Sequence, residues 1–138
     1  MGEAKPINQS LNRWLWVGQW TLALLFGAYV IKAVAPIVWL AHWMKWPDDV
    51  PAWLVRFTGF IEALGAIGIV GPAWFRIWPQ ITVLAAAGFV VVQILAIGFH
   101  LWRGEILIAT TGNLFLLGLS LFVLIGRWKL CPIACKGC

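Results

Sequence analysis

The three cysteines of this chain all lie within its last eight residues, in the sequence CPIACKGC. Cys131, Cys135 and Cys138 follow the spacing C-x3-C-x2-C. Thiolates are preferred ligands of soft metal ions such as Cu(I), Zn(II) and Hg(II), and three thiolates this close in sequence can surround one ion. The tail is therefore a candidate metal site.

A second set of candidates consists of polar side chains within apolar stretches. Charged groups in hydrocarbon are costly and usually face the interior of a helix bundle. We expect such residues to form a small polar cavity in which a carboxylate and an imidazole bind a ligand or relay protons. The candidate ligand-binding residues are Lys32, Arg56, Glu62, Gln93, His100, Arg103, Glu105 and Asn113.

The composition indicates a chain that lies largely in lipid. Of its 138 residues, 62% are hydrophobic and 11% are charged, whereas soluble domains carry about 25% charged residues. The chain has 11 tryptophans, a residue that concentrates at membrane–water interfaces. The net charge of +5 therefore favours contact with anionic lipid and a role in topology over nucleic-acid binding.

Four segments are apolar and long enough to cross a bilayer, which needs about 20 residues per helix. We expect an all-α membrane protein, a four-transmembrane-helix bundle over residues 1–130 followed by a tail over residues 131–138. Pro72 and Pro79 are expected to break the second connection. The segment after Pro36, PIVWLAHWMKWPDD, predicts a short interfacial helix. The expected spans are Trp14–Ala35, Trp53–Val70, Ile81–Leu101 and Ile106–Ile125.

Basic residues are distributed unequally between the two sides of the predicted bundle. The side with the termini holds six, and the other side holds three, which favours termini in the cytoplasm and a reduced tail. Tryptophans are expected to form a belt on each side. The basic residues on the side of the termini are Lys5, Arg13, Arg76, Arg127, Lys129 and Lys136, and those on the other side are Lys45, Arg56 and Arg103. The tryptophans of the expected outer belt are Trp39, Trp43, Trp46, Trp53 and Trp102.

The candidate polar residues fall in the outer half of the bundle or at its middle. Glu62 lies nine residues after Trp53, which places it about 13 Å into the second span. Gln93 and His100 are seven residues apart and share one face of the third span. The inner half is expected to be nearly all apolar, although Asn113, Ser120 and Arg127 form one stripe along the fourth span.

Each of these residues also has a structural interpretation. Glu62 can be a buried partner of Arg56 or Lys32 that only fixes packing. Lysine and arginine near span ends can extend toward headgroups, and Gln93 and Asn113 can join helices by hydrogen bonds. Both interpretations remain open at the level of sequence.

Several stretches together resemble one family. The second span, FTGFIEALGAIGIVGP, and the later stretches FHLWRGE and TGNLFLLGLSLFVLIGR are similar to the DoxX-like family of small four-helix membrane proteins, as is the lysine in FGAYVIKAVAP. The resemblance covers residues 14–127. The Trp-rich outer connection and the cysteine tail are not part of the pattern. The resemblance implies characteristic polar positions at Lys32, Glu62, His100, Arg103, Glu105, Asn113 and Arg127.

The resemblance also implies a bacterial or archaeal cytoplasmic (inner) membrane protein linked to redox or sulfur metabolism. The family is named after a membrane subunit of a thiosulfate–quinone oxidoreductase. We therefore expect a component of a membrane redox system that binds a quinone and works with a redox partner subunit. A small transporter or channel, a membrane scaffold, a soft-metal-handling protein and a homo-oligomer are alternatives that the sequence leaves open.

The tail can be tested alone. Replacing Cys131, Cys135 and Cys138 together by serine should abolish binding of Zn(II) or Cu(I) by the purified protein, because serine provides no thiolate. Metal analysis after equilibration with one ion per chain measures this. Equal metal content in the unaltered protein and the serine variant would contradict the prediction.

Overall fold

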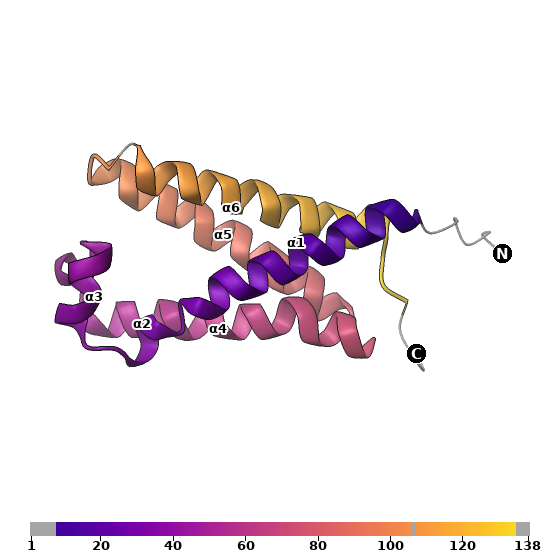
Figure 1. Ribbon diagram of the computed structural model, residues 1–138, viewed down its shortest axis with the longest axis horizontal. Helices are drawn as coiled ribbons and strands as arrows, with labels where there is room; N and C mark the ends of the chain where they lie inside the picture. The colour runs from indigo at the N-terminus through magenta and orange to yellow at the C-terminus, as the bar shows by residue number, and fades with distance from the viewer. Residues whose placement is uncertain (1–7, 106, 135–138) are drawn as a thin grey trace.

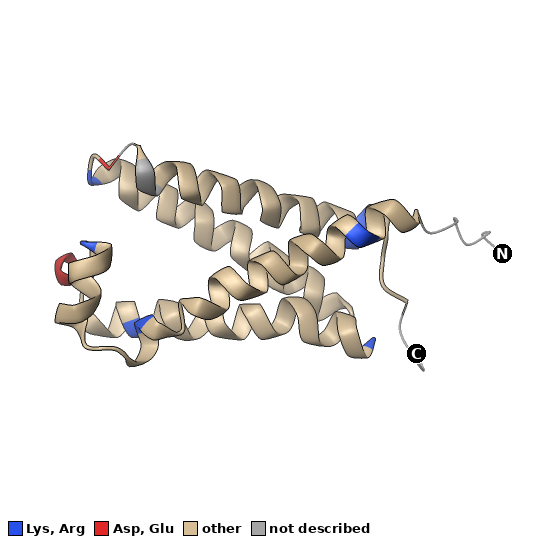
Figure 2. Cartoon of the chain, in the orientation of Figure 1, with Lys and Arg blue, Asp and Glu red and all other residues tan. Residues whose placement is uncertain are grey.

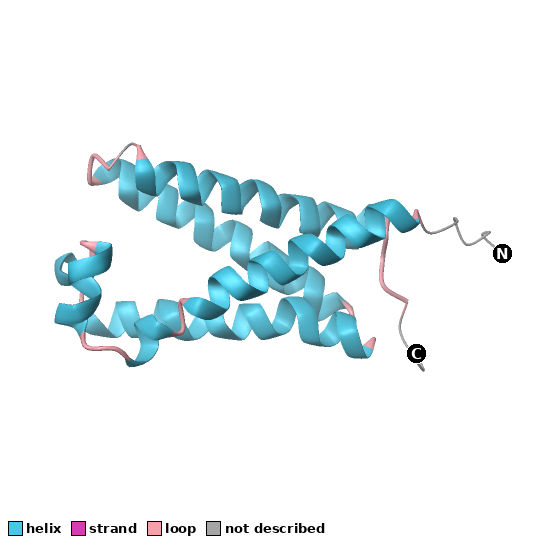
Figure 3. Cartoon of the chain, in the orientation of Figure 1, coloured by secondary structure: helices cyan, strands magenta, loops and turns pink. Residues whose placement is uncertain are grey.

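The computed structural model describes residues 8–105 and 107–134, and these residues form helices joined by short turns (Figure 3). The predicted all-α fold class is therefore confirmed, and the described residues contain no strand. The elements are α1 (Gln9–Ala28), α2 (Ile31–Val34), α3 (Ile37–Met44), the 3-10 turn η1 (Pro47–Asp49), α4 (Ala52–Phe75), α5 (Gln80–Trp102), α6 (Ile108–Ile125) and the π-helical turn η2 (Gly126–Leu130).

The long helices pack as a bundle in which α1 lies against α4 and α6, and α5 also lies against α4 and α6 (Figure 1). The start of α1 and the end of α6 are at the same end of the bundle. The core is apolar and is centred on the parallel stack of Phe26 and Phe89, whose ring centroids are 3.9 Å apart.

Four stretches are long and apolar enough to cross a membrane: Gln9–Val34, Ala52–Phe75, Gln80–Trp102 and Thr110–Leu130. Large apolar side chains such as Leu24, Ile67 and Leu84 point outward. In water this surface would be strongly unfavourable, whereas hydrocarbon solvates it. Charged residues gather near the two ends of the bundle (Figure 2). The chain is therefore a multi-pass membrane protein.

The first span ends at Val34, within one residue of its prediction, but it differs in its start and in an internal break. It begins at Gln9 rather than Trp14, and it is interrupted at Tyr29 and Val30. The backbone N–H groups of Tyr29 and Val30 donate to residues three positions earlier, Phe26 and Gly27, each at 3.1 Å. Such tight bonds belong to a 3-10 turn. The turn separates α2 from α1.

The short helix predicted after Pro36 is present as α3, which begins at Ile37. It ends at Lys45, whose φ of 64° is in the left-handed region that terminates helices. Figure 1 shows α3 at the end of the bundle away from the described ends of the chain. Its place at a membrane surface stays a prediction.

The expectation that Pro72 breaks the second connection was wrong. The helix α4 runs through Pro72 to Phe75 and ends where Arg76 adopts a left-handed φ of 59°. Proline removes one backbone donor, but the N–H of Arg76 still bonds to the Pro72 carbonyl, and Ala73 is buried on the same helix. Packing therefore continues the helix beyond the proline.

The third predicted span agrees with α5 to within one residue at each end. The fourth begins at Ile108 in the structure, and Ile106 lies outside the described residues. The helix then continues beyond Ile125 as the π-helical turn η2, which ends at Leu130.

The closest approach between α2 and α4 occurs at Gly59. A Cβ atom on Gly59 would lie 2.7 Å from both the Ala33 nitrogen and the Lys32 Cβ, too close for any real contact. Gly59→Ala should therefore force the helices apart and lower the free energy of unfolding by about 1–3 kcal/mol. Thermal or denaturant unfolding in detergent micelles measures this.

Gly88 on α5 provides the matched control, because a Cβ there would meet nothing within 4 Å. Gly88→Ala should leave stability unchanged or raise it by up to about 1 kcal/mol, since alanine favours helix over glycine. Equal effects of the two substitutions would show that the α2–α4 crossing does not depend on Gly59.

Candidate functional site

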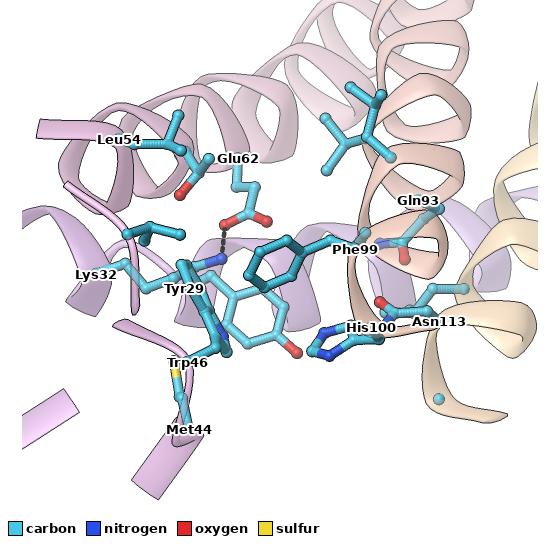
Figure 4. A pocket seen from close by; sticks show the side chains of 17 residues that line it. Tyr29, Lys32, Met44, Trp46, Leu54, Glu62, Gln93, Phe99, His100 and Asn113 are labelled. Atoms are coloured by element: carbon cyan, nitrogen blue, oxygen red, sulfur yellow. Dashed lines mark ion pairs between the residues drawn. The ribbon is translucent and has the colours of Figure 1, made fainter. Parts of the chain in front are cut away.

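A cavity of about 570 Å³ lies between the long helices, at the end of the bundle that contains α3. Its wall is mostly apolar, with a few polar side chains that point inward (Figure 4). This size and lining are typical of sites for small organic ligands. Five of the residues predicted from the sequence line the cavity together: Lys32, Glu62, Gln93, His100 and Asn113.

One wall carries an ion pair between two helices. The Lys32 Nζ lies 2.5 Å from the Glu62 Oε2, and the two residues are only 6% and 5% exposed. The ammonium group also lies over the ring of Tyr29, at 4.4 Å from its centroid, and 5.6 Å from that of Trp46. Aromatic faces attract cations. Lys32, rather than Arg56, is therefore the partner of Glu62.

The opposite wall is formed by α5 and α6. Gln93 is buried, and His100 is seven residues further along the same face of α5. Asn113 projects from α6 beside them (Figure 4). The polar groups therefore lie on two facing walls, with the rings of Tyr29, Trp46 and Phe99 around the space between them.

Arg56 does not line the cavity. Its guanidinium donates hydrogen bonds to the backbone carbonyls of Lys32, at 3.2 Å, and Ala35. These are carbonyls at the C-terminal end of α2, where a helix lacks internal donors and favours positive charge. Arg56 therefore caps α2 and fixes it to α4.

Arg103 and Glu105 also lie outside the cavity, in the turn between α5 and α6. Arg103 pairs with Asp49 of η1 and, at 3.1 Å, with Glu105. Hydrogen bonds from His100 and then from Arg103 lower the pKa of Glu105. The hydrogen bonds that Arg103 donates to Asp49 and Glu105 raise the pKa of Arg103. Arg103 therefore joins the segment after α3 to the end of α5.

The sequence did not predict Tyr29, Met44, Trp46, Thr58 or Phe99 as cavity residues. Trp46 was expected in an outer aromatic belt. It lines the cavity and contacts Phe99, with ring centroids 6.1 Å apart, and its place in a belt stays a prediction. Aromatic residues are frequent throughout this chain, and only the fold distinguishes those that face lipid from those that face the cavity.

The half of the bundle that contains the start of α1 and the end of α6 was predicted to be nearly all apolar, and this prediction was wrong. Arg127 is 3% exposed, and its guanidinium donates to Gln19 and Asn12, each at 2.7 Å. Gln19 in turn donates to the Ile69 carbonyl at 2.6 Å. The stripe of polar residues along the fourth span pointed to Arg127. Its partners, Gln19 and Asn12, come from α1, where no periodic pattern in the sequence indicated them.

Among the predicted metal ligands, only Cys131 belongs to the described residues, and it is buried near Asn12. Cys135 and Cys138 lie outside the described residues. No group of three metal-ligating side chains occurs within residues 8–105 and 107–134. The metal site in the tail stays a prediction.

Four apolar helices around a cavity with a buried ion pair define a small multi-pass membrane protein of the four-helix class. The chain belongs to the DoxX-like family, whose model matches residues 17–123. No curated protein and no solved structure matches the chain.

The ion pair yields a prediction for stability. Lys32→Met should lower the free energy of unfolding by about 3–5 kcal/mol, because it leaves the Glu62 carboxylate buried without its partner. The double variant Lys32→Met with Glu62→Leu should be more stable than Lys32→Met alone, because no unpaired charge remains. Denaturant unfolding followed by tryptophan fluorescence measures both.

Lys129→Met is the matched control, because Lys129 is exposed at the other end of the bundle and should tolerate the change. If the effects of the two cavity substitutions simply add in the double variant, Lys32 and Glu62 are not coupled.

Proposed function

We propose that this protein is a component of a membrane redox system and that the cavity binds a quinone. The observation that carries the proposal is the position of polar groups on two facing walls of an otherwise apolar and aromatic cavity. A quinone has a flat apolar ring with an oxygen at each of two opposite edges, and it dissolves in the lipid that surrounds the bundle. Its size and polarity therefore match the cavity.

The residues of the chain would each have a distinct part in this binding. Lys32 would donate to one ligand oxygen, with Glu62 keeping the ammonium group in place. Gln93 and Asn113 would contact the oxygen at the opposite edge, beside His100. Tyr29, Trp46 and Phe99 would pack against the ring. A bound quinone would accept or release electrons, which a redox partner subunit would exchange with it.

A transporter is the second candidate, because the buried Arg127 cluster gives the inner half polar groups of its own. The order of residues along the chain puts the core between the two polar regions. Phe26 and Phe89 each lie three residues before a cavity residue, Tyr29 and Val92. A stacked aromatic pair gives an ion no ligands. This arrangement favours binding over passage.

The unequal distribution of basic residues supports an orientation with both termini in the cytoplasm. In the inner membrane of a prokaryote, the cavity would then lie in the outer half of the bilayer. The quinone would reach it from the lipid or from the outer surface.

The proposal is tested by ligand content. Protein purified in mild detergent should release a quinone on solvent extraction, and a quinone with a short tail should bind the quinone-free protein. Glu62→Gln should weaken that binding at least tenfold, because Lys32 loses the anion that positions it. Titration of tryptophan fluorescence, with Trp46 in the cavity wall, measures the dissociation constant.

Asp48→Asn is the control, because it makes the same chemical change at an exposed residue that does not line the cavity. It should leave the dissociation constant unchanged. Absence of quinone in the extract together with equal binding by Glu62→Gln and the unaltered protein would rule out the proposed function.

A further inference from the structure

His100 connects the cavity to a carboxylate outside it. Its ring lines the cavity and points to the side on which Tyr29 lies (Figure 4). One ring nitrogen, Nδ1, is 2.6 Å from the Glu105 Oε2. The other, Nε2, forms no hydrogen bond with a described residue. Nε2 is therefore available to a ligand.

Glu105 decides which nitrogen of His100 carries the proton. Its side chain is 30% exposed and is held by Arg103, which donates to Oε1 through two nitrogens at 3.1 and 3.2 Å. The hydrogen bonds from His100 and then from Arg103 lower the pKa of Glu105, which favours its ionised form. A carboxylate can only accept hydrogen bonds, so Nδ1 must donate. In a neutral imidazole, Nε2 is then an acceptor.

The wall that faces His100, formed by α2 and α4, presents a donor and an acceptor side by side. The Lys32 ammonium group can only donate, and the Glu62 carboxylate can only accept. A ligand carbonyl oxygen can satisfy Lys32 but not Glu62 or His100. A ligand hydroxyl group both accepts and donates, so one hydroxyl can contact Lys32 and Glu62 while a second donates to His100.

We propose that the cavity selects the reduced, hydroxyl-bearing form of its ligand, a quinol rather than the corresponding quinone, through the acceptor Nε2 of His100. Glu105 is a positioning residue, because it fixes the tautomer of His100 and does not contact the ligand. This inference rests on the proposed function, since it names the redox state in which the same ligand is bound.

The test compares the two redox forms of one ligand. A benzoquinone with a ten-carbon tail and its chemically reduced quinol are titrated anaerobically into the quinone-free protein in detergent, and tryptophan fluorescence is recorded. The unaltered protein should bind the quinol about tenfold more tightly, because the quinone leaves an acceptor on each wall unsatisfied.

Two variants assign the preference to His100. His100→Leu should weaken quinol binding about tenfold and leave quinone binding within about twofold, because only the quinol donates to Nε2. His42→Leu is the matched control, since His42 is exposed on α3 and does not line the cavity. It should leave both dissociation constants unchanged.

A third variant tests the positioning role of Glu105 without removing His100. NMR of isotope-labelled histidine nitrogens should show the Nδ1-protonated tautomer of His100 in the unaltered protein. In Glu105→Gln, both tautomers should appear, because an amide can donate or accept, and the preference for quinol should decrease. A change that affected only folding would not alter the tautomer.

The outcomes separate this inference from the proposed function. If neither form binds, the proposed function fails. If both forms bind equally, if the quinone binds more tightly, or if His100 carries its proton on Nε2, the cavity is a quinone site without the proposed selectivity, and the inference is overturned.

Discussion

The buried ion pair between Lys32 and Glu62 constrains the rest of this bundle. Two charges with exposures near 5% can remain inside a membrane protein only in direct contact, because each alone would be costly to bury. Contact requires α2 to lie close against α4, and Gly59 permits that approach. Arg56 then satisfies the last carbonyls of α2, which makes the crossing stable.

The same constraint explains why a cavity exists. The turn at Tyr29 and Val30 ends α1, which packs against both α4 and α6, and starts α2, which packs against α4. Beyond that turn, α1 no longer packs between α4 and α6, and large rings border the space that it leaves. Tyr29, Trp46 and Phe99 surround it without filling it. One interruption of the first span thus both positions Lys32 beside Glu62 and leaves the cavity that these residues line.

The sequence predicted what hydrophobicity and helical spacing determine. Low charge and long apolar segments predicted four spans, and isolated polar residues such as Glu62 and Gln93 identified the cavity-facing sides of α4 and α5. It could not predict what depends on contacts between distant residues. Arg56 and Arg103 looked like cavity residues because of their depth, yet they bind backbone and loop groups. Pro72 was expected to be a helix end because a proline taken alone predicts one, and the packing that continues α4 beyond it is not visible in the sequence. Gln19 on α1 gave no signal, since its role depends on Arg127, 108 residues away.

The two polar regions of the bundle differ in a way that bears on function. Around Arg127, the bonded acceptors are the neutral oxygens of Gln19, Asn12 and the Cys131 backbone, and they join α1 to the end of α6. Those contacts use the guanidinium to join helices, and Arg127 does not line the cavity. Around Glu62, by contrast, opposite charges meet beside open space, where their remaining hydrogen-bonding capacity faces a ligand and not another helix. Arg127 thus joins helices, although its Nη2 has no partner among the described residues, whereas Lys32 and Glu62 border a cavity and are available for binding. The cavity wall is therefore where the chemistry of this protein is expected, and Cys131, at the other end of the bundle, does not line it.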